Sequence, residues 1–347
     1  MPGFDLGELG WSPELADNLE PGLVPGRVAA VHRGAIDVWT ADAAVRARLP
    51  GRLMHDGTDV AVGDWVGLGE GLIRSVLPRR SAIVRNAASD QHRRTQGQTL
   101  AANVDVAFVV SSLGPDLEPR RIERYLVTIW ESGASPEIVL TKADRYDDPW
   151  DLVAEVERVA LGVPVHVVSA LSGHGCDALR ARIAVGSTAV LLGSSGVGKS
   201  TLVNHWLGDE VMATKETRVD DDEGRHTTTH RQLLVLPSGG LVIDTPGLRE
   251  LQLWDVGSAS LDATFSDVEE LAADCRFGDC THTHEPGCAV LAATETGELS
   301  HGRLHSWRKL QRELRAIEMR HNALLRKEEL RKWKLRTREG RARTRLR

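Results

Sequence analysis

The chain has 347 residues, of which 41% are hydrophobic and 27% are charged, and its formal net charge is −6. This balance is typical of a soluble globular protein with two or three domains, and no apolar run approaches the roughly 20 residues that a membrane-spanning helix needs. The first 20 residues are acidic and lack the basic and apolar regions of a signal peptide, so we expect a cytoplasmic protein that has no membrane partner.

The N-terminal part of the chain predicts a short extension followed by a small β-barrel. Residues 1–22 are rich in Gly, Pro and acidic residues and are expected to be a loose lead-in. From Gly26 to Val84, short apolar runs alternate with Gly, Asp and Pro, and about five strands of this kind fit an OB-fold. RNA binding by this barrel would use its arginines, whereas the alternative is a packing domain with a charged surface. The arginines are Arg27, Arg33, Arg46, Arg48, Arg52, Arg74, Arg79 and Arg80.

The middle of the chain predicts a parallel sheet. Residues 86–98 are polar and are expected to be a linker. Beyond them, apolar runs alternate with helical spacing, which indicates a parallel sheet with helices on both faces. The expected strands are 104–111, 138–141, 165–169, 189–192, 232–236 and 241–244. The expected helices are 118–131, 149–160, 176–184 and 199–207.

A phosphate-binding loop follows the expected strand 189–192. The segment from Gly193 to Ser200 matches G-x-x-x-x-G-K-[ST] at every fixed position and precedes an expected helix. Backbone amides of such a loop face phosphate, while Lys199 reaches the β and γ phosphates and Ser200 binds Mg²⁺. The residues expected to bind nucleotide here are Gly193, Ser194, Ser195, Gly196, Val197, Gly198, Lys199, Ser200 and Thr201.

Two downstream segments predict the rest of the phosphate and magnesium site. The expected strand 241–244 ends in the D-x-x-G motif of Asp244 and Gly247. Asp244 would hold magnesium through a water, and the Gly247 amide would bind the γ-phosphate. Between the phosphate loop and D-x-x-G lies the polar segment 224–229, where Thr228 is the candidate for a second hydroxyl ligand to Mg²⁺. The alternative is that the three threonines of this segment are strand residues.

The base-binding residues are expected upstream of the phosphate loop. Thr141, Lys142 and Asp144 form a T-K-x-D motif at the end of a strand, and Ser169 and Ala170 end the next one. Asp144 can accept both N1–H and N2–H₂ of guanine, which adenine cannot offer. Lys142 would lie over the base, Thr141 would tie its loop to the phosphate loop, and the Ser169–Ala170 backbone would meet guanine O6.

The order of these motifs is that of a circularly permuted GTPase. The base motif and Ser169–Ala170 precede the phosphate loop, whereas ordinary small GTPases have them after D-x-x-G. Because chain termini of a domain lie at the surface and often close together, opening the chain elsewhere leaves the sheet intact. The fold class is therefore α/β: a permuted P-loop GTPase domain with an N-terminal OB-fold and a C-terminal helical zinc-binding domain.

The C-terminal part of the chain predicts a zinc site and a basic arm. Cys275, Cys280, His282 and Cys288 supply a closed Cys₃His set, which suits one structural Zn²⁺. His284 is a spare candidate for the imidazole ligand, and buried thiols without metal are the alternative. An apolar stripe at helical spacing follows at Trp307, Leu310, Leu314, Ile317 and Leu324.

The charge of the chain is divided unevenly. Residues 301–347 carry 17 Lys and Arg against five Glu, a net of +12, so residues 1–300 carry −18. A basic tail on an acidic body favours a polyanionic partner such as nucleic acid, whereas the alternative is a solvated helix. The expected domains are 1–24 extension, 25–85 OB-fold, 86–98 linker, 99–255 GTPase, 256–335 zinc-binding domain and 336–347 basic tail.

In combination, these motifs resemble the ribosome-small-subunit-dependent GTPase A family over residues 25–310. The resemblance is carried by 61–66, 78–81, 101–105, 193–201, 224–229, 244–248 and the zinc pattern. It implies a GTPase that binds the small ribosomal subunit late in assembly, contacts ribosomal RNA through its OB-fold and zinc domain, and is stimulated by the subunit. Two features depart from the family: Thr141 stands where many members have Asn, and the arginine-rich tail after Arg336 lies outside the shared pattern.

Hydrolysis needs a group other than the residue after D-x-x-G. Leu248 occupies the position where many GTPases have a water-orienting glutamine, and a leucine cannot orient water. His226 is the candidate for orienting the water, together with Lys199 and Thr228 as catalytic residues. The alternatives are water positioned by ribosomal RNA or by the backbone, with His226 only structural.

We expect a monomer that binds GTP and GDP with Mg²⁺. The competing functions are a non-enzymatic RNA-binding protein and a permuted GTPase with another target.

Overall fold

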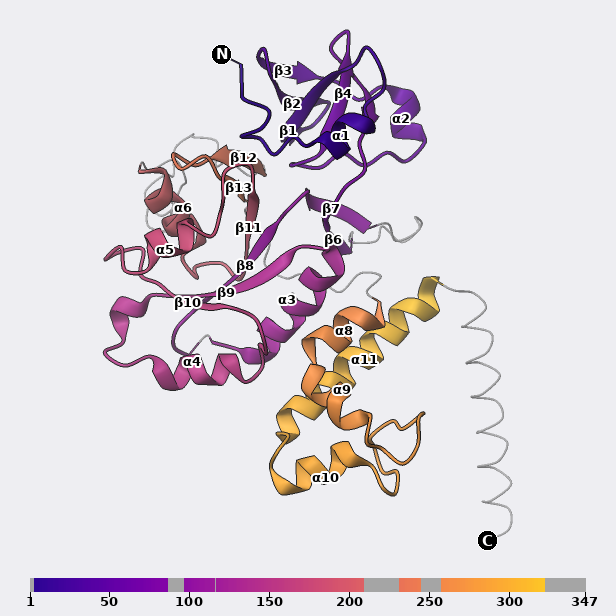
Figure 1. Ribbon diagram of the computed structural model, residues 1–347, viewed down its shortest axis with the longest axis vertical. Coiled ribbons are helices and arrows are strands. Elements are labelled where there is room, and N and C mark those ends of the chain that lie inside the picture. The colour runs from indigo at the N-terminus through magenta and orange to yellow at the C-terminus, as the bar shows by residue number, and fades with distance from the viewer. Residues whose placement is uncertain (1–2, 87–96, 116, 209–230, 245–256, 322–347) are drawn as a thin grey trace. The chain divides into compact units, whose positions relative to one another are not determined.

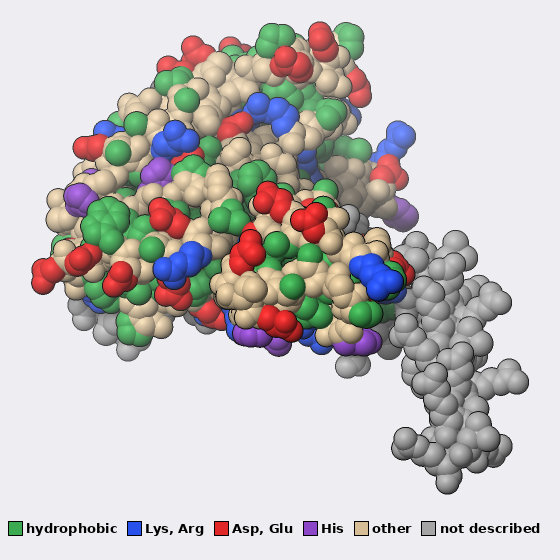
Figure 2. Space-filling model, turned by 60° about the horizontal axis from the view of Figure 1, so that its bottom comes forward, with side chains coloured by type: hydrophobic (Ala, Val, Ile, Leu, Met, Phe, Trp, Pro, Cys, Tyr) green, Lys and Arg blue, Asp and Glu red, His purple; other side chains and the backbone are tan. Residues whose placement is uncertain are grey.

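A computed structural model describes the following residues of the chain: 3–86, 97–115, 117–208, 231–244 and 257–321. They fall into two compact units, Met1–Gln252 and Leu253–Arg347 (Figure 1). No helix among the described residues is long and apolar enough to cross a membrane. Acidic side chains are spread over the face shown in Figure 2, in keeping with the acidic balance of residues 1–300.

Five short strands form a closed barrel in the first unit. They are β1 (Val24–His32), β2 (Ala35–Thr40), β3 (Ala44–Ala47), β4 (Trp65–Gly69) and β5 (Leu72–Val76). β1 pairs with β2 and β4, β2 with β3, and β4 with β5, all antiparallel. A parallel bridge between Arg48 and Leu72 joins the end of β3 to β5 and closes the ring. Alternate residues such as Val28, Val38 and Ile73 fill the interior. The predicted small barrel is therefore present, with helix α2 (Gly51–His55) between β3 and β4.

The N-terminal segment packs on this barrel, so the expectation of a loose lead-in was wrong. Leu9 and Leu15, the latter in α1 (Pro13–Asp17), are buried in the main core. The ring of Phe4 stacks on Trp39 with centroids 4.7 Å apart, and Trp11 meets Trp65 edge-on at 4.8 Å. Large aromatic rings hold the segment through burial, which its Gly- and Pro-rich composition conceals.

A separate hairpin connects the barrel to the next domain. β6 (Ala82–Asn86) pairs antiparallel with β7 (Gly97–Ala102) in a two-stranded sheet of its own. β6 thus lies outside the barrel although it falls within the predicted range 25–85. Most of the expected linker, residues 87–96, lies outside the described residues.

The domain that follows this hairpin is built on a sheet in the order β10-β9-β8-β11-β13-β12. Its strands are β8 (Val106–Ser112), β9 (Ser135–Thr141), β10 (Val165–Val167), β11 (Thr188–Leu192), β12 (Gln232–Val235) and β13 (Leu241–Asp244). All neighbours are parallel except β12 and β13, which pair antiparallel as a hairpin. This confirms the predicted parallel sheet.

Helices cover both faces of this sheet because its strands alternate apolar side chains to the two sides. The covering helices are α3 (Pro119–Ser132), α4 (Trp150–Glu157), α5 (Cys176–Arg180) and α6 (Lys199–Leu207), with a short η1 (Ala143–Arg145). α3 and α4 pack on one face with Val109 of β8, whereas α5 and α6 pack on the other face with Phe108. Cys176, the one cysteine of the chain outside the predicted zinc set, is buried on the α5 side.

The barrel and the parallel sheet are joined by three of the segments that carry the family resemblance. Asp64 of the first segment accepts hydrogen bonds of 2.7 and 2.8 Å from the Arg79 guanidinium of the second. Asn103 of the third accepts from the Arg80 amide at 3.0 Å and donates to the Gly63 carbonyl at 3.0 Å. In addition, Ala30 of β1 pairs with Gln232 of β12. These motifs therefore form a polar joint between the barrel and the sheet.

The described part of the second unit is helical, as predicted for the chain beyond Asp262. Its helices are α8 (Ser258–Thr264), α9 (Ser266–Ala272), α10 (Ala289–Thr296) and α11 (His301–His321). Trp307, Leu310 and Leu314 form the buried stripe of α11. Arg303 of α11 ties it to α9, because its guanidinium lies 2.9 Å from the Asp267 carboxylate and over the Phe265 ring. Of the remaining stripe residues, Ile317 is half-buried and Leu324 lies outside the described residues.

Candidate nucleotide-binding and zinc sites

The phosphate loop stands between β11 and α6, as its sequence context predicted. Gly193, Gly196 and Gly198 all have positive φ, a conformation that residues with a Cβ rarely adopt. A Cβ on Gly193 would come within 2.1 Å of the Val110 carbonyl oxygen. The glycines of the motif thus let the backbone turn tightly before α6 begins at Lys199, which leaves the amides at the helix start available to an anion.

Lys199 lies folded across its own loop. Its ammonium donates to the carbonyl oxygens of Gly193 at 2.8 Å and Ser194 at 2.7 Å. Burial lowers the pKa of Lys199 to about 8, although the nearby Asp244 carboxylate favours the charged form. The cation is therefore held at the loop where it can exchange carbonyl partners for phosphate oxygens.

The base motif meets the phosphate loop. The Thr141 hydroxyl donates to the Val197 carbonyl at 2.5 Å and lies 3.3 Å from the Ser111 carbonyl. Thr141 ends β9, whereas Val197 lies 56 residues further along the chain within the loop. The structure thus brings together the two motifs, at the carboxyl edge of the parallel strands, where open α/β sheets bind ligands.

The two base-side loops are locked to each other. The Ser169 hydroxyl donates to the Asp144 carboxylate at 2.5 Å, and the Ala143 amide donates to the Val168 carbonyl at 3.2 Å. Lys142 has a φ of 61°, which turns the chain sharply before η1 and sets Asp144 after it. Ala170 packs against the core on the α5 side. The predicted guanine contacts therefore come from one rigid pair of loops.

The magnesium residues are described only in part. Ser200 and Thr201 lie in the first turn of α6, and Asp244 ends β13, which pairs in parallel with β11. Asp244 is 8% exposed. The parallel pairing puts Asp244 at the same sheet edge as the phosphate loop. His226, Thr228, Gly247 and Leu248 lie outside the described residues, so their roles stay predictions.

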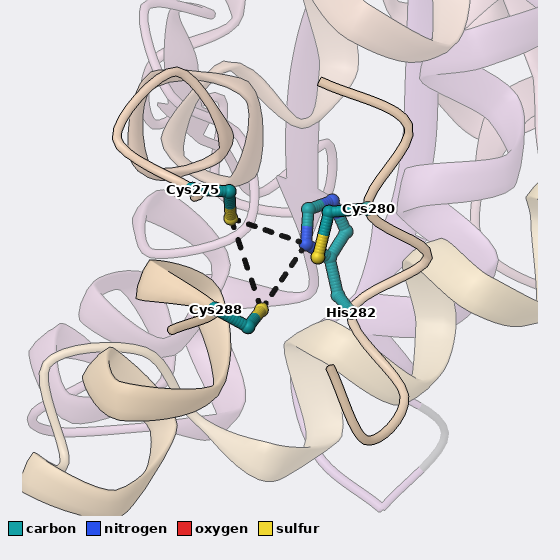
Figure 3. Close-up of side chains that lie close together, drawn as sticks. All are labelled: Cys275, Cys280, His282 and Cys288. Carbon is teal, nitrogen blue, oxygen red and sulfur yellow. Dashed lines mark hydrogen bonds between the residues drawn. The ribbon is translucent and has the colours of Figure 1, made fainter. Parts of the chain in front are cut away.

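The four predicted zinc ligands converge in the second unit (Figure 3). Their ligand atoms all lie within 4.8 Å of one another. The Cys275 and Cys288 sulfurs are 3.8 Å apart, and His282 Nδ1 is 3.6 Å from the first and 3.4 Å from the second. Tetrahedral zinc with Zn–S of about 2.3 Å and Zn–N of about 2.0–2.1 Å requires edges of about 3.8 Å for S–S and about 3.5 Å for S–N. These side chains therefore fit a structural Zn²⁺, which they would hold as three thiolates and one imidazole.

His282, and not the spare His284, belongs to this cluster. His284 is exposed. His282 is 4% exposed, and its ring lies 5.2 Å from that of Trp307. Burial lowers the pKa of His282, which favours the neutral imidazole that binds zinc.

The sequence analysis missed two side chains, one that contacts the loop of the zinc ligands and one that contacts the phosphate loop. The Glu285 carboxylate accepts hydrogen bonds from the amides of Thr281, Thr283 and His284 at 2.8–3.1 Å and so shapes the loop that presents Cys280 and His282. The Thr281 hydroxyl also donates to this carboxylate, and that hydrogen bond, followed by those from the amides of His284 and Thr283, lowers the pKa of Glu285. A carboxylate among threonines between two ligands could have signalled this role.

The second missed side chain is Arg121 of α3, which donates to the Ser194 hydroxyl at 2.9 Å. Nothing in the local sequence marks that contact.

Comparisons with known proteins agree with this arrangement. The family model described as RsgA GTPase matches residues 76–254. The small ribosomal subunit biogenesis GTPase RsgA of Streptomyces avermitilis is 50% identical over 340 residues, which cover 96% of this chain and 90% of that protein. Its counterpart in Streptomyces coelicolor is 49% identical over 97% of this chain and 94% of that protein.

Two solved structures are similar as well. The crystal structure of YjeQ from Thermotoga maritima has a TM-score of 0.63 and 28% identity, and the match covers 84% of this chain and 98% of that one. The structure of YloQ, described as a circularly permuted GTPase, has a TM-score of 0.60 and 25% identity over 85% of this chain and 96% of that one. The second likeness supports the permuted order of motifs found here.

Proposed function

Because the chain belongs to the RsgA GTPase family and hydrolyses GTP, we propose that it binds the small ribosomal subunit during late assembly and uses hydrolysis to drive its own release. The two Streptomyces relatives, whose alignments cover 96–97% of this chain, are named small ribosomal subunit biogenesis GTPases. The observation that carries the nucleotide-binding part of the proposal is the Thr141–Val197 contact, since it joins a guanine motif to a phosphate loop that follows it in the chain.

The proposed nucleotide contacts divide between the two edges of the site. Asp144 reads the guanine edge, Lys142 covers the ring, and the backbone at Ser169–Ala170 meets O6. The loop Gly193–Thr201 wraps the phosphates, with Ser200 and Thr228 as the hydroxyl ligands of Mg²⁺. Asp244 would hold the ion through a water, and the Gly247 amide would meet the γ-phosphate.

Hydrolysis at this site is a displacement by water. Water attacks the γ-phosphorus, the bond to the oxygen that bridges the β and γ phosphorus atoms breaks, and GDP, phosphate and a proton are formed. Lys199 stabilises the negative charge on the β and γ oxygens. We assign the orientation of the water to His226, because Leu248 has no group that can do it. Orientation by ribosomal RNA is the alternative.

We propose that two parts of the protein contact ribosomal RNA. They are the barrel, which would act as an OB-fold, and the zinc-binding domain. Six of the eight arginines that the sequence analysis singled out are exposed: Arg33, Arg46, Arg48, Arg52, Arg74 and Arg80. Arg27 is fully buried and Arg79 is bound to Asp64 at the joint, so these two serve the fold instead. The exposed set supplies phosphate contacts, which position RNA without reading its sequence. We propose that the protein acts as a cytoplasmic monomer.

The decisive experiment measures GTP turnover with and without purified small ribosomal subunits. We expect slow turnover alone and strong stimulation by the subunit. Stimulation by another RNA or protein, but not by the subunit, would indicate a permuted GTPase with a different target. Binding to the subunit without any change in turnover would favour an RNA-binding protein in which GTP is only a slow conformational label.

A further inference from the structure

The first turn of α3 holds the phosphate loop from outside the proposed nucleotide contacts. One guanidinium nitrogen of Arg121 donates to the Ser194 hydroxyl at 2.9 Å, and another lies 2.6 Å from the Glu118 carboxylate. Glu118, Arg121, Ser194 and Val197 line one hollow between the helix and the loop. The guanidinium therefore bridges the carboxylate of the N-cap residue Glu118 and the loop, with the side chains of Arg121 and Glu118 42% and 53% exposed.

α3 is a firm support for this contact. Ile122, Leu126 and Ile129 are buried against the sheet, each 2% exposed or less. At its other end Gly133 terminates the helix, and a Cβ placed there would lie 3.1 Å from the Arg80 carbonyl at the barrel joint. The helix is thus packed along its length, and Arg121 extends from an element that does not need nucleotide to keep its position.

The loop needs such a support because its own backbone is permissive. Three of its residues are glycines with positive φ, which lose the most conformational freedom when the loop is ordered. Ser194 is also one of the two residues whose carbonyls hold the Lys199 ammonium. Fixing the Ser194 side chain therefore fixes the carbonyl that sets the starting position of the phosphate-binding cation.

We propose that Arg121 is a positioning residue of the phosphate loop, which acts through Ser194 to hold the loop ready for phosphate; this rests on the proposed nucleotide site. Arg121 need not touch the nucleotide. Its effect falls on the phosphates that GDP and GTP share, because the loop wraps both. Loss of Arg121 should therefore weaken the binding of GDP and of GTP to a similar degree and leave the preference for guanine unchanged.

The test compares Arg121→Ala with Arg120→Ala, which removes the same charge from an exposed neighbouring position. Dissociation of fluorescent GDP and of a fluorescent non-hydrolysable GTP analogue is followed by stopped flow. We expect Arg121→Ala to speed both by about tenfold, equivalent to about 1.4 kcal/mol, and Arg120→Ala to stay within about twofold of wild type, since the charge of an exposed side chain is screened by salt. Equal rates in the two variants would overturn the proposal.

A double-mutant cycle separates positioning from a general structural effect. Ser194→Ala should speed dissociation about as much as Arg121→Ala, and the double variant no more than either, because all three lose the same hydrogen bond. Arg121→Lys should dissociate more slowly than Arg121→Ala but faster than wild type, since lysine keeps a donor but lacks the guanidinium geometry that binds two partners at once. Additive effects would refute the proposal, and Ser194→Ala alone tests it should Arg121→Ala fail to fold. Wild-type protein that binds neither nucleotide would instead refute the proposed site.

Discussion

The guanidinium of Arg27 on β1 donates a hydrogen bond of 3.0 Å to the hydroxyl of Thr188, the first residue of β11. Both side chains are fully buried. Arg27 also donates to the carbonyls of Leu9 at 2.5 Å and Asn103 at 3.2 Å. One buried cation thus joins the N-terminal segment, the barrel and the strand that leads into the phosphate loop. Burial lowers the pKa of Arg27 to about 10, so it stays charged at neutral pH.

The first prediction concerns this joint. Thr188→Val keeps the shape of the side chain but removes the hydroxyl that accepts from Arg27. We expect a loss of about 1–2 kcal/mol in the free energy of unfolding, because a buried charged donor loses one of its partners. Urea unfolding followed by tryptophan fluorescence measures it, as a lower midpoint at constant m-value.

Thr188→Ser is the matched control, since serine keeps the hydroxyl and should lose less. A Thr188→Val protein as stable as wild type would show that the carbonyls of Leu9 and Asn103 satisfy Arg27 without help. Because β11 ends at the phosphate loop, the same variant should also release GDP somewhat faster.

The second prediction concerns pH. Lys199 has a pKa of about 8 in the nucleotide-free protein, and only its charged form attracts phosphate. Affinity for GDP should therefore be constant below about pH 8 and fall by up to about tenfold per pH unit above it, because binding then requires uptake of a proton. Titrations with fluorescent GDP at constant ionic strength, from about pH 6.5 to pH 9, measure this dependence.

Lys199→Arg is the control, since arginine stays charged throughout this range. Its weaker binding should be independent of pH. An unchanged wild-type affinity up to pH 9 would mean that Lys199 is fully charged before nucleotide binds, contrary to the effect of its burial.

Much of this fold could be predicted from the sequence because the signals are local. The expected helix 199–207 and strand 241–244 agree with α6 and β13 to the residue, since a glycine-rich loop and a buried apolar run delimit them. The pairing of Ala30 with Gln232 and the burial of Arg27 could not be predicted. Both depend on partners far apart in the chain, and an arginine is expected at the surface.

The same distinction holds for the sites. The zinc ligands fall within 14 residues, so their spacing alone indicates a cluster, and the structure brings their ligand atoms together. Arg121 and Ser194 are 73 residues apart, and an arginine at the start of a helix has no pattern that points to a phosphate loop. What sequence cannot supply is the set of side chains that hold a motif in place from another element.

The third prediction concerns the base. Asp144→Asn should weaken GTP binding by about two orders of magnitude, because a charged acceptor of two guanine donors is replaced by an amide that offers a mismatched donor. Xanthosine triphosphate has a carbonyl in place of the N2 amine and should bind the variant better than GTP does. Competition against fluorescent GDP compares the two nucleotides. The assignment of Asp144 fails if the variant still prefers GTP.

The fourth prediction concerns zinc. Cys280→Ala should abolish stoichiometric zinc and unfold the second unit, because the binding energy of a structural zinc is folding energy. GDP affinity should survive, since the nucleotide residues lie in the first unit. Metal analysis, circular dichroism and nucleotide titration of one preparation test the three statements together. His284→Ala is the matched control and should keep its zinc; freshly purified wild-type protein without zinc would contradict the site.

The last prediction concerns the step that ends subunit binding. His226→Ala should still bind GTP and the small subunit, whereas stimulated turnover should fall by about a hundredfold or more, the scale expected of a positioned catalytic side chain. A ligand shifts an equilibrium only by its differential affinity for two states, so release on hydrolysis requires the GTP state to bind the subunit more tightly than the GDP state. A tenfold gap corresponds to about 1.4 kcal/mol of coupling. The variant should therefore accumulate on subunits in GTP and leave them in GDP, as sedimentation can measure. Equal sedimentation in both nucleotides would exclude this coupling while leaving the GTPase intact, and undiminished turnover would remove His226 from catalysis and favour water positioned by ribosomal RNA.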